Sequence, residues 1–75
     1  MNTEEYLKLI EYVRKNHRFA KNGRHIKYID TTVDIRDGEI FSVNFRMFGN
    51  AEKHFRIYSK ECIDDIYKWL DEIYE

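Results

Sequence analysis

The segment IDTTVDIRDGEIFSVNFRMFGNAEKHFRIY, residues 29–58, decides the fold because apolar and polar residues alternate along three parts of it. Alternation with a period of two is typical of strands that bury one face. The pattern predicts strands over about 29–35, 41–47 and 54–58. The side chains expected to face the core are Ile29, Thr31, Val33, Ile35, Phe41, Val43, Phe45, Met47, Phe55 and Ile57.

The turns between these strands fix how they pair. Asp37-Gly38 suggests a two-residue hairpin, but that register mixes polar and apolar residues on each face. A three-residue loop over 36–38, with Gly38 as a left-handed bulge, keeps the apolar residues together, and residues 48–50 form a similar loop. The resulting cross-strand pairs are Thr31–Val43, Val33–Phe41, Val43–Phe55 and Phe41–Ile57.

Helical periodicity flanks the strands on both sides. Residues 3–21 carry one apolar face, Asn2 and Glu5 have the spacing of a capping box, and Asn22-Gly23 supplies a stop. Ser59 is expected to cap a second helix. The two apolar faces consist of Tyr6, Leu9, Ile10, Val13, His17 and Ala20, and of Ile63, Ile66, Tyr67, Leu70, Ile73 and Tyr74.

Two amphipathic helices and a one-sided sheet predict an α+β two-layer sandwich in the order α-β-β-β-α. Both helices would cover one face of a three-stranded antiparallel meander, and the other face would stay open. A chain of 75 residues makes a single domain, residues 1–75.

Composition points to a soluble cytoplasmic protein. Either a monomer or a homodimer is expected, and the sequence does not choose between them. Cys62 is the one cysteine, so no internal disulfide is expected. The first residues are acidic, unlike a signal peptide, and no apolar run reaches membrane-spanning length.

No motif of a known catalytic or phosphate-binding class is present, so we expect no enzymatic activity, no cofactor and no metal. The soft ligands His17, His25, His54 and Cys62 lack the close spacing typical of metal sites. Cys62 is interpreted as a small buried thiol in the first turn of the last helix rather than as a nucleophile paired with a histidine.

Charge is segregated along the chain, although the formal net charge is only −1. Between Glu11 and Asp30 there is no acid, and from Ser59 onward acids predominate. The basic segment could neutralise phosphates of DNA or RNA. Its cations are Arg14, Lys15, Arg18, Lys21, Arg24 and Lys27. The alternative is that these cations complement the helix dipole or pair with acids of the last helix.

Two further surfaces are candidates for contact with a protein partner. The open sheet face should carry Tyr28, Arg46, His54, Arg56 and Tyr58, which are residue types enriched in binding hot spots. The last helix presents a row of carboxylates that resembles a phosphate backbone. These are Glu61, Asp64, Asp65, Asp71, Glu72 and Glu75. The alternative for the sheet face is an ordinary solvated surface with cross-strand pairs, and for the helix a solvated acidic face.

Three resemblances bear on function. The element order is that of double-stranded-RNA-binding domains, although the start of the last helix, Lys-rich in that family, reads SKECIDD (59–65) here. Residues 21–28, KNGRHIKY, resemble the first strand of integrase arm-binding domains, which lay a three-stranded sheet in the major groove. In size, build and acidic helix the chain is similar to several phage anti-CRISPR proteins.

The expected function is therefore that of a small non-enzymatic binding protein encoded by a phage or mobile element. It would inhibit a host or defence nucleoprotein by occlusion, as anti-CRISPR proteins do. The alternative is a nucleic-acid-binding domain that uses segment 14–27 and the open sheet face.

Overall fold

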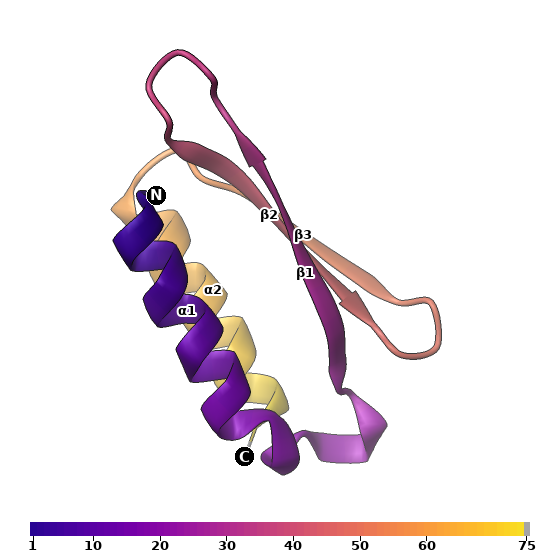
Figure 1. Cartoon of the computed structure of the whole chain (residues 1–75). Helices are drawn as coiled ribbons and strands as arrows, with labels where there is room; N and C mark the ends of the chain where they lie inside the picture. Colours follow the sequence, from indigo (N-terminus) through magenta and orange to yellow (C-terminus); the bar gives the residue numbers. More distant parts are fainter. Residues whose placement is uncertain (75) are drawn as a thin grey trace.

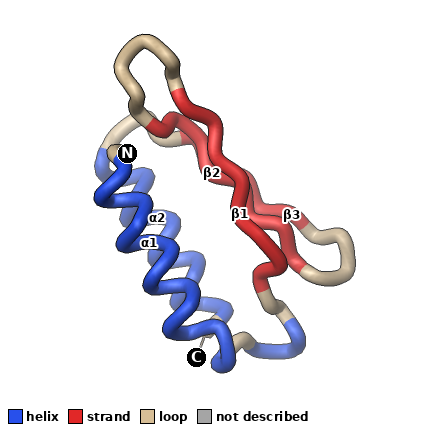
Figure 2. Tube along the Cα trace, in the orientation of Figure 1, coloured by secondary structure: helices blue, strands red, loops and turns tan. Residues whose placement is uncertain are grey.

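The computed structural model describes residues 1–74, except for the side chain of Asn22. Its three strands form one antiparallel sheet in the order β1-β2-β3. Both helices lie side by side on one face of this sheet, and the other face is uncovered (Figures 1 and 2). The predicted α-β-β-β-α sandwich is confirmed. The elements are α1 (Thr3–Asn16), the 3₁₀ turns η1 (His17–Phe19) and η2 (Lys21–Gly23), β1 (Ile26–Val33), β2 (Ile40–Met47), β3 (Glu52–Arg56) and α2 (Lys60–Ile73).

The two helices run in the same direction, because three antiparallel strands separate them in the chain (Figure 1). Both helices therefore end at the same end of the molecule, where η1 and η2 also lie. The β2–β3 loop lies toward this end on the side of the sheet (Figure 1). The β1–β2 loop and the first turns of both helices lie at the opposite end (Figure 1).

The first helix begins as predicted and ends earlier than predicted. The Asn2 side chain accepts a hydrogen bond from the Glu5 N–H (2.8 Å), and the Glu5 carboxylate accepts one from the Asn2 N–H (2.9 Å), so the capping box is formed. The helix stops at Asn16, not at residue 21. The Asn16 side chain donates to the Tyr12 carbonyl (2.9 Å), which is the local competition with helical bonding that asparagine favours.

The strand register is confirmed at its centre and wrong at one end. Thr31 pairs with Val43, and Val43 pairs with Phe55. Val33, however, pairs with Ile40, which leaves Phe41 as the extra residue of a β-bulge. The connection between the strands spans residues 34–39, longer than expected, because the Asp34 N–H donates to the Glu39 carbonyl (2.8 Å).

The bulge exchanges two side chains between core and surface. Ile40 is buried, whereas Phe41, expected in the core, is 40% exposed. Val33 is 44% exposed, and Ile35, also expected inside, is 97% exposed in the loop beyond β1. The helices therefore cover only the central part of the alternating pattern.

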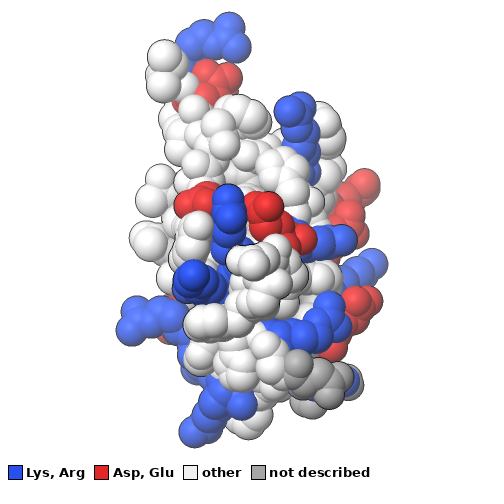
Figure 3. Space-filling model, turned by 90° about the vertical axis from the view of Figure 1, so that its right-hand side faces the viewer, with Lys and Arg blue, Asp and Glu red and all other residues white. Residues whose placement is uncertain are grey.

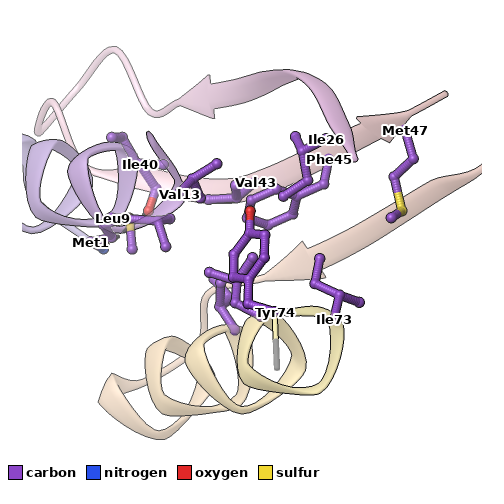
Figure 4. Packing of buried hydrophobic residues seen from close by; sticks show 12 residues of the cluster. Met1, Leu9, Val13, Ile26, Ile40, Val43, Phe45, Met47, Ile73 and Tyr74 are labelled. Atoms are coloured by element: carbon purple, nitrogen blue, oxygen red, sulfur yellow. Dashed lines mark hydrogen bonds between the residues drawn. The ribbon is translucent and has the colours of Figure 1, made fainter. Parts of the chain in front are cut away.

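The core lies between the central strand and the two helices (Figure 4). Phe45 is fully buried, and its ring centroid lies 5.0 Å from that of Trp69 and 5.9 Å from that of Phe55. The other fully buried large side chains are Leu9, Val43, Ile66, Leu70 and Ile73. Burial of each such side chain stabilises the fold by about 1.5–3 kcal/mol.

Tyrosines connect the two helices. The rings of Tyr12 and Tyr67 meet edge to face at 5.1 Å, and the Tyr12 hydroxyl donates a hydrogen bond to the Asp71 carboxylate. This bond to Asp71 raises the pKa of Tyr12 above its ordinary value. Tyr74, directly after α2, is buried with its hydroxyl unpartnered among the described residues, and burial raises its pKa to about 12.

Candidate functional site

The basic segment folds into one end of the molecule, which we call the basic end. Its cations lie on the last turn of α1, on η1 and η2, directly after η2, and at the start of β1. Figure 3 looks onto the open side of the sheet, and Lys and Arg side chains predominate over its lower half, where this end lies. The cations are thus brought together by the turns that connect α1 to β1, and not by a single helix or strand. The basic end is defined by Arg14, Lys15, Arg18, Lys21, Arg24 and Lys27.

Five of these six cations form no ion pair with an acid of residues 1–74. Within residues 1–74, no ion pair joins an acidic side chain to Arg14, Lys15, Arg18, Arg24 or Lys27. The pairing of Arg14 or Lys15 with acids of the last helix is therefore absent from the described part of the chain. A phosphate could approach these five side chains without displacing a described carboxylate.

A groove of 410 Å³ runs between α1 and β1 at the basic end. Its apolar lining consists of Ile10, Val13, Ile26 and Ile29, of which Val13 and Ile26 are buried. Its polar lining consists of Arg14, His17, Lys27 and Tyr28. We call it the α1–β1 groove. It combines an apolar floor with cationic side chains, and its volume falls in the range of roughly 300–1,000 Å³ typical of ligand pockets.

Exposed aromatic rings lie among the cations. Phe19 is 49% exposed, and the Arg18 guanidinium carbon lies 4.9 Å from its ring centroid. Phe48, in the β2–β3 loop, is 59% exposed and is held beside the start of β1 by its N–H bond to the His25 carbonyl (3.2 Å). Periodicity and charge in the sequence did not single out these two rings, although the Arg18-Phe19 dipeptide offered a signal.

Two histidine side chains also lie at the basic end. The rings of His17 and His25 meet edge to face, with centroids 4.8 Å apart. His17, predicted on the apolar helix face, is exposed instead because it follows the end of α1 and lines the groove. These rings add hydrogen-bonding nitrogens to the cationic side chains.

The open sheet face carries four of its five predicted residues. The rows Tyr28–Arg46–Glu52, Asp30–Asn44–His54 and Thr32–Ser42–Arg56 form as predicted. Tyr58 does not join the face, because β3 ends at Arg56; the predicted fourth row, Asp34–Ile40–Tyr58, is therefore wrong.

The centre of the sheet face is paired within itself. Glu52 accepts from the Asn44 side-chain amide (3.1 Å) and forms an ion pair with Arg46 (3.3 Å). The Arg46 guanidinium also lies over the Tyr28 ring, 5.9 Å from its centroid. Exposed pairs of this kind contribute only about 0–1 kcal/mol, so a bound anion could redirect Arg46 at small cost.

The acidic face of α2 is solvated. Glu61, Asp64, Asp65 and Glu72 are exposed and form no ion pair within the described residues. Asp71 accepts the Tyr12 hydrogen bond described above. Glu75 lies outside the described residues.

Cys62 lies in the first turn of α2 as predicted, but it is half-buried rather than buried. Its sulfur accepts a hydrogen bond from the Tyr58 N–H (3.4 Å) and lies 4.0 Å from the Ser59 hydroxyl oxygen. Backbone N–H groups of Tyr58 and Ser59 lower the pKa of the thiol. Ser59 occupies the predicted N-cap position, but its side chain makes no capping bond, which corrects that part of the prediction.

Residues 1–74 contain no group of three His, Cys, Asp or Glu side chains arranged to hold a metal ion. In the same part of the chain, neither helix has the length and apolar character needed to cross a membrane. The chain matches no protein-family model, no curated protein and no solved structure.

Proposed function

We propose that this protein is a non-catalytic nucleic-acid-binding protein whose contact surface is the basic end together with the adjoining part of the open sheet face. One observation carries the proposal: five cations gather at one end of the molecule, two of them lining a groove, and none forms an ion pair with a described acid. Cations of this kind release counterions when they neutralise phosphates, which drives binding. The five are Arg14, Lys15, Arg18, Arg24 and Lys27.

Helix-dipole compensation does not account for all of these charges. It applies to Arg14 and Lys15, which lie in the last turn of α1. Arg24 follows η2, and Lys27 lies on β1. Their positions favour a role in binding.

Charge reversal at the basic end tests the proposal. The variant Arg24→Glu/Lys27→Glu would be compared with Lys60→Glu/Lys68→Glu, which changes the net charge equally through exposed lysines of α2. Fluorescence anisotropy with labelled DNA and RNA oligonucleotides, from 50 to 200 mM salt, gives affinity and its salt dependence.

We expect the basic-end variant to bind at least about tenfold more weakly. The slope of log K against log salt should become less steep by about 0.7–0.9 for each phosphate that the variant no longer neutralises. Equal effects of the two double variants would contradict the proposal.

The solvated carboxylates of α2 favour a second function, the inhibition of a host or defence nucleoprotein by occlusion. In this anti-CRISPR-like role, the α2 face would cover a basic channel of the partner in place of nucleic acid, and a phage or mobile element would encode the protein.

The test of this second function is co-purification from nuclease-treated host lysate. The partner should be retained by Arg24→Glu/Lys27→Glu and lost by Glu61→Gln/Asp64→Asn/Asp65→Asn. Recovery of no protein partner, together with tight DNA or RNA binding, would rule it out.

A further inference from the structure

We infer that the nucleic acid bound at the basic end is single-stranded and that the α1–β1 groove accepts one of its unpaired bases. This inference rests on the proposed function and names the class of strand that the same surface takes.

The floor of the α1–β1 groove cannot be explained by phosphate binding. Val13 and Ile26 are buried below it, and the half-buried Ile10 and Ile29 complete an apolar lining. Phosphates remain hydrated and gain nothing from such a surface. A nucleobase has two apolar faces and a polar edge, and it gains from leaving water when it enters such a groove.

The rim of the groove suits the groups that accompany an unpaired base. Arg14 and Lys27 are exposed cations on opposite sides, one from α1 and one from β1, and neither is paired with a described acid. They are placed to hold the phosphates before and after the base. Tyr28, 44% exposed, also lines the groove, and its ring can stack on a base once the Arg46 guanidinium, 5.9 Å from the ring centroid, has moved aside.

Stacking surfaces continue beyond the groove. Phe19 and Phe48 expose their rings at the same end, each beside a basic or imidazole-bearing residue. Successive unpaired bases stack on such rings largely without regard to sequence. In a duplex, both faces of each base are already covered by its neighbours, so neither these rings nor the groove floor would be used.

The experiment uses the full chain and four labelled probes of equal length: a 12-nucleotide DNA strand, the RNA of the same sequence, the DNA duplex, and a DNA strand in which the central bases are replaced by abasic sites. The protein variants are Tyr28→Ala, Tyr28→Phe and Tyr58→Ala. Tyr58 is the matched control, because it is 78% exposed and follows β3 at the opposite end. All three substitutions are at exposed positions, and circular dichroism checks that each variant is folded.

We expect the single strands to bind at least about tenfold tighter than the duplex, and the abasic strand to bind about as weakly as the duplex. Tyr28→Ala should weaken single-strand binding about fivefold or more, as the loss of one stacked base does. Tyr28→Phe and Tyr58→Ala should retain it.

Two results would overturn the inference in distinguishable ways. Duplex or abasic binding as tight as single-strand binding, or equal effects of Tyr28→Ala and Tyr58→Ala, would refute the single-strand site and leave the proposed function standing. Failure of all four probes to bind would refute both.

Discussion

Phe45 is a fully buried side chain through which β2 packs against α2. Its ring is fully buried against Trp69 and Phe55. Alternation in the sequence placed it in the core, and the structure confirms that position. Because a domain of this size has a total stability of only roughly 4–11 kcal/mol, one such residue decides whether the chain folds.

Phe45→Ala should lower the free energy of unfolding by about 3–5 kcal/mol, because the loss of a large buried ring leaves a cavity. Urea denaturation followed by circular dichroism measures the change. Phe41→Ala serves as the control and should cost less, since Phe41 is 40% exposed. A cost below about 1 kcal/mol for Phe45→Ala would show that the ring is not in the core.

Tyr74 makes stability depend on pH in the alkaline range. Its pKa is raised from 10.0 to about 12, so the unfolded chain loses the proton at lower pH than the folded chain. The protonated Tyr74 side chain therefore contributes fully to the free energy of unfolding below pH 10. This contribution, at most roughly 2–3 kcal/mol, is lost as the pH rises toward 12. Denaturation midpoints at pH 9, 10 and 11 measure this loss.

The matched variant for this prediction is Tyr74→Phe. It removes a buried hydroxyl that has no partner among the described residues, so stability at pH 7 should stay equal or rise by about 1 kcal/mol. Its alkaline loss should be smaller than that of the wild type. An unchanged pH profile would mean that another group carries the dependence.

At the scale of elements, local signals predicted the starts of structures better than their ends. The capping box at Asn2 and the left-handed Gly38 (φ +73°) were both readable from the sequence. The end of α1 was not, because the apolar spacing continues past Asn16 while the Asn16 side chain competes for a backbone carbonyl. Similarly, alternation gave the central pairing, but nothing in the pattern marks Phe41 as the bulged residue.

Asn2→Ala should destabilise the protein by about 1 kcal/mol, since it removes the side-chain acceptor of the α1 cap. Asn2→Gly should cost only a few tenths of a kcal/mol, because glycine is tolerated at this position. Thermal denaturation of the wild type and the two variants in parallel gives the comparison. If alanine and glycine were equally costly, the cap would contribute little.

At the scale of the whole molecule, the sequence shows which residues are basic but not that two of them, Arg14 and Lys27, line a groove. Segment 14–27 stood out because its run of cations is uninterrupted by acids. The lining of the α1–β1 groove includes Ile10 and Ile29, which the sequence pattern predicts as ordinary core residues. In the chain, the two 3₁₀ turns η1 and η2 lie between them. No spacing rule brings them together. The sheet face was better predicted, because its rows follow from the register alone. The ion pair between Arg46 and Glu52 is one of the cross-strand pairs expected if this face is only solvated.

Because the two helices run in the same direction, their negative dipole ends point to one pole of the protein. Neighbouring antiparallel helices would cancel these fields, whereas here they add. The lysines and arginines at that pole thus act as built-in counterions in the free protein, Arg14 and Lys15 most directly. Reversing Arg14 and Lys15 should therefore lower stability by about 0.3–1 kcal/mol each, whereas reversing Arg24 and Lys27 should change it by less than about 0.5 kcal/mol. A polyanion that binds here would contact cations that already stabilise the helix ends. This pole would therefore be the first part of the protein to be affected by binding.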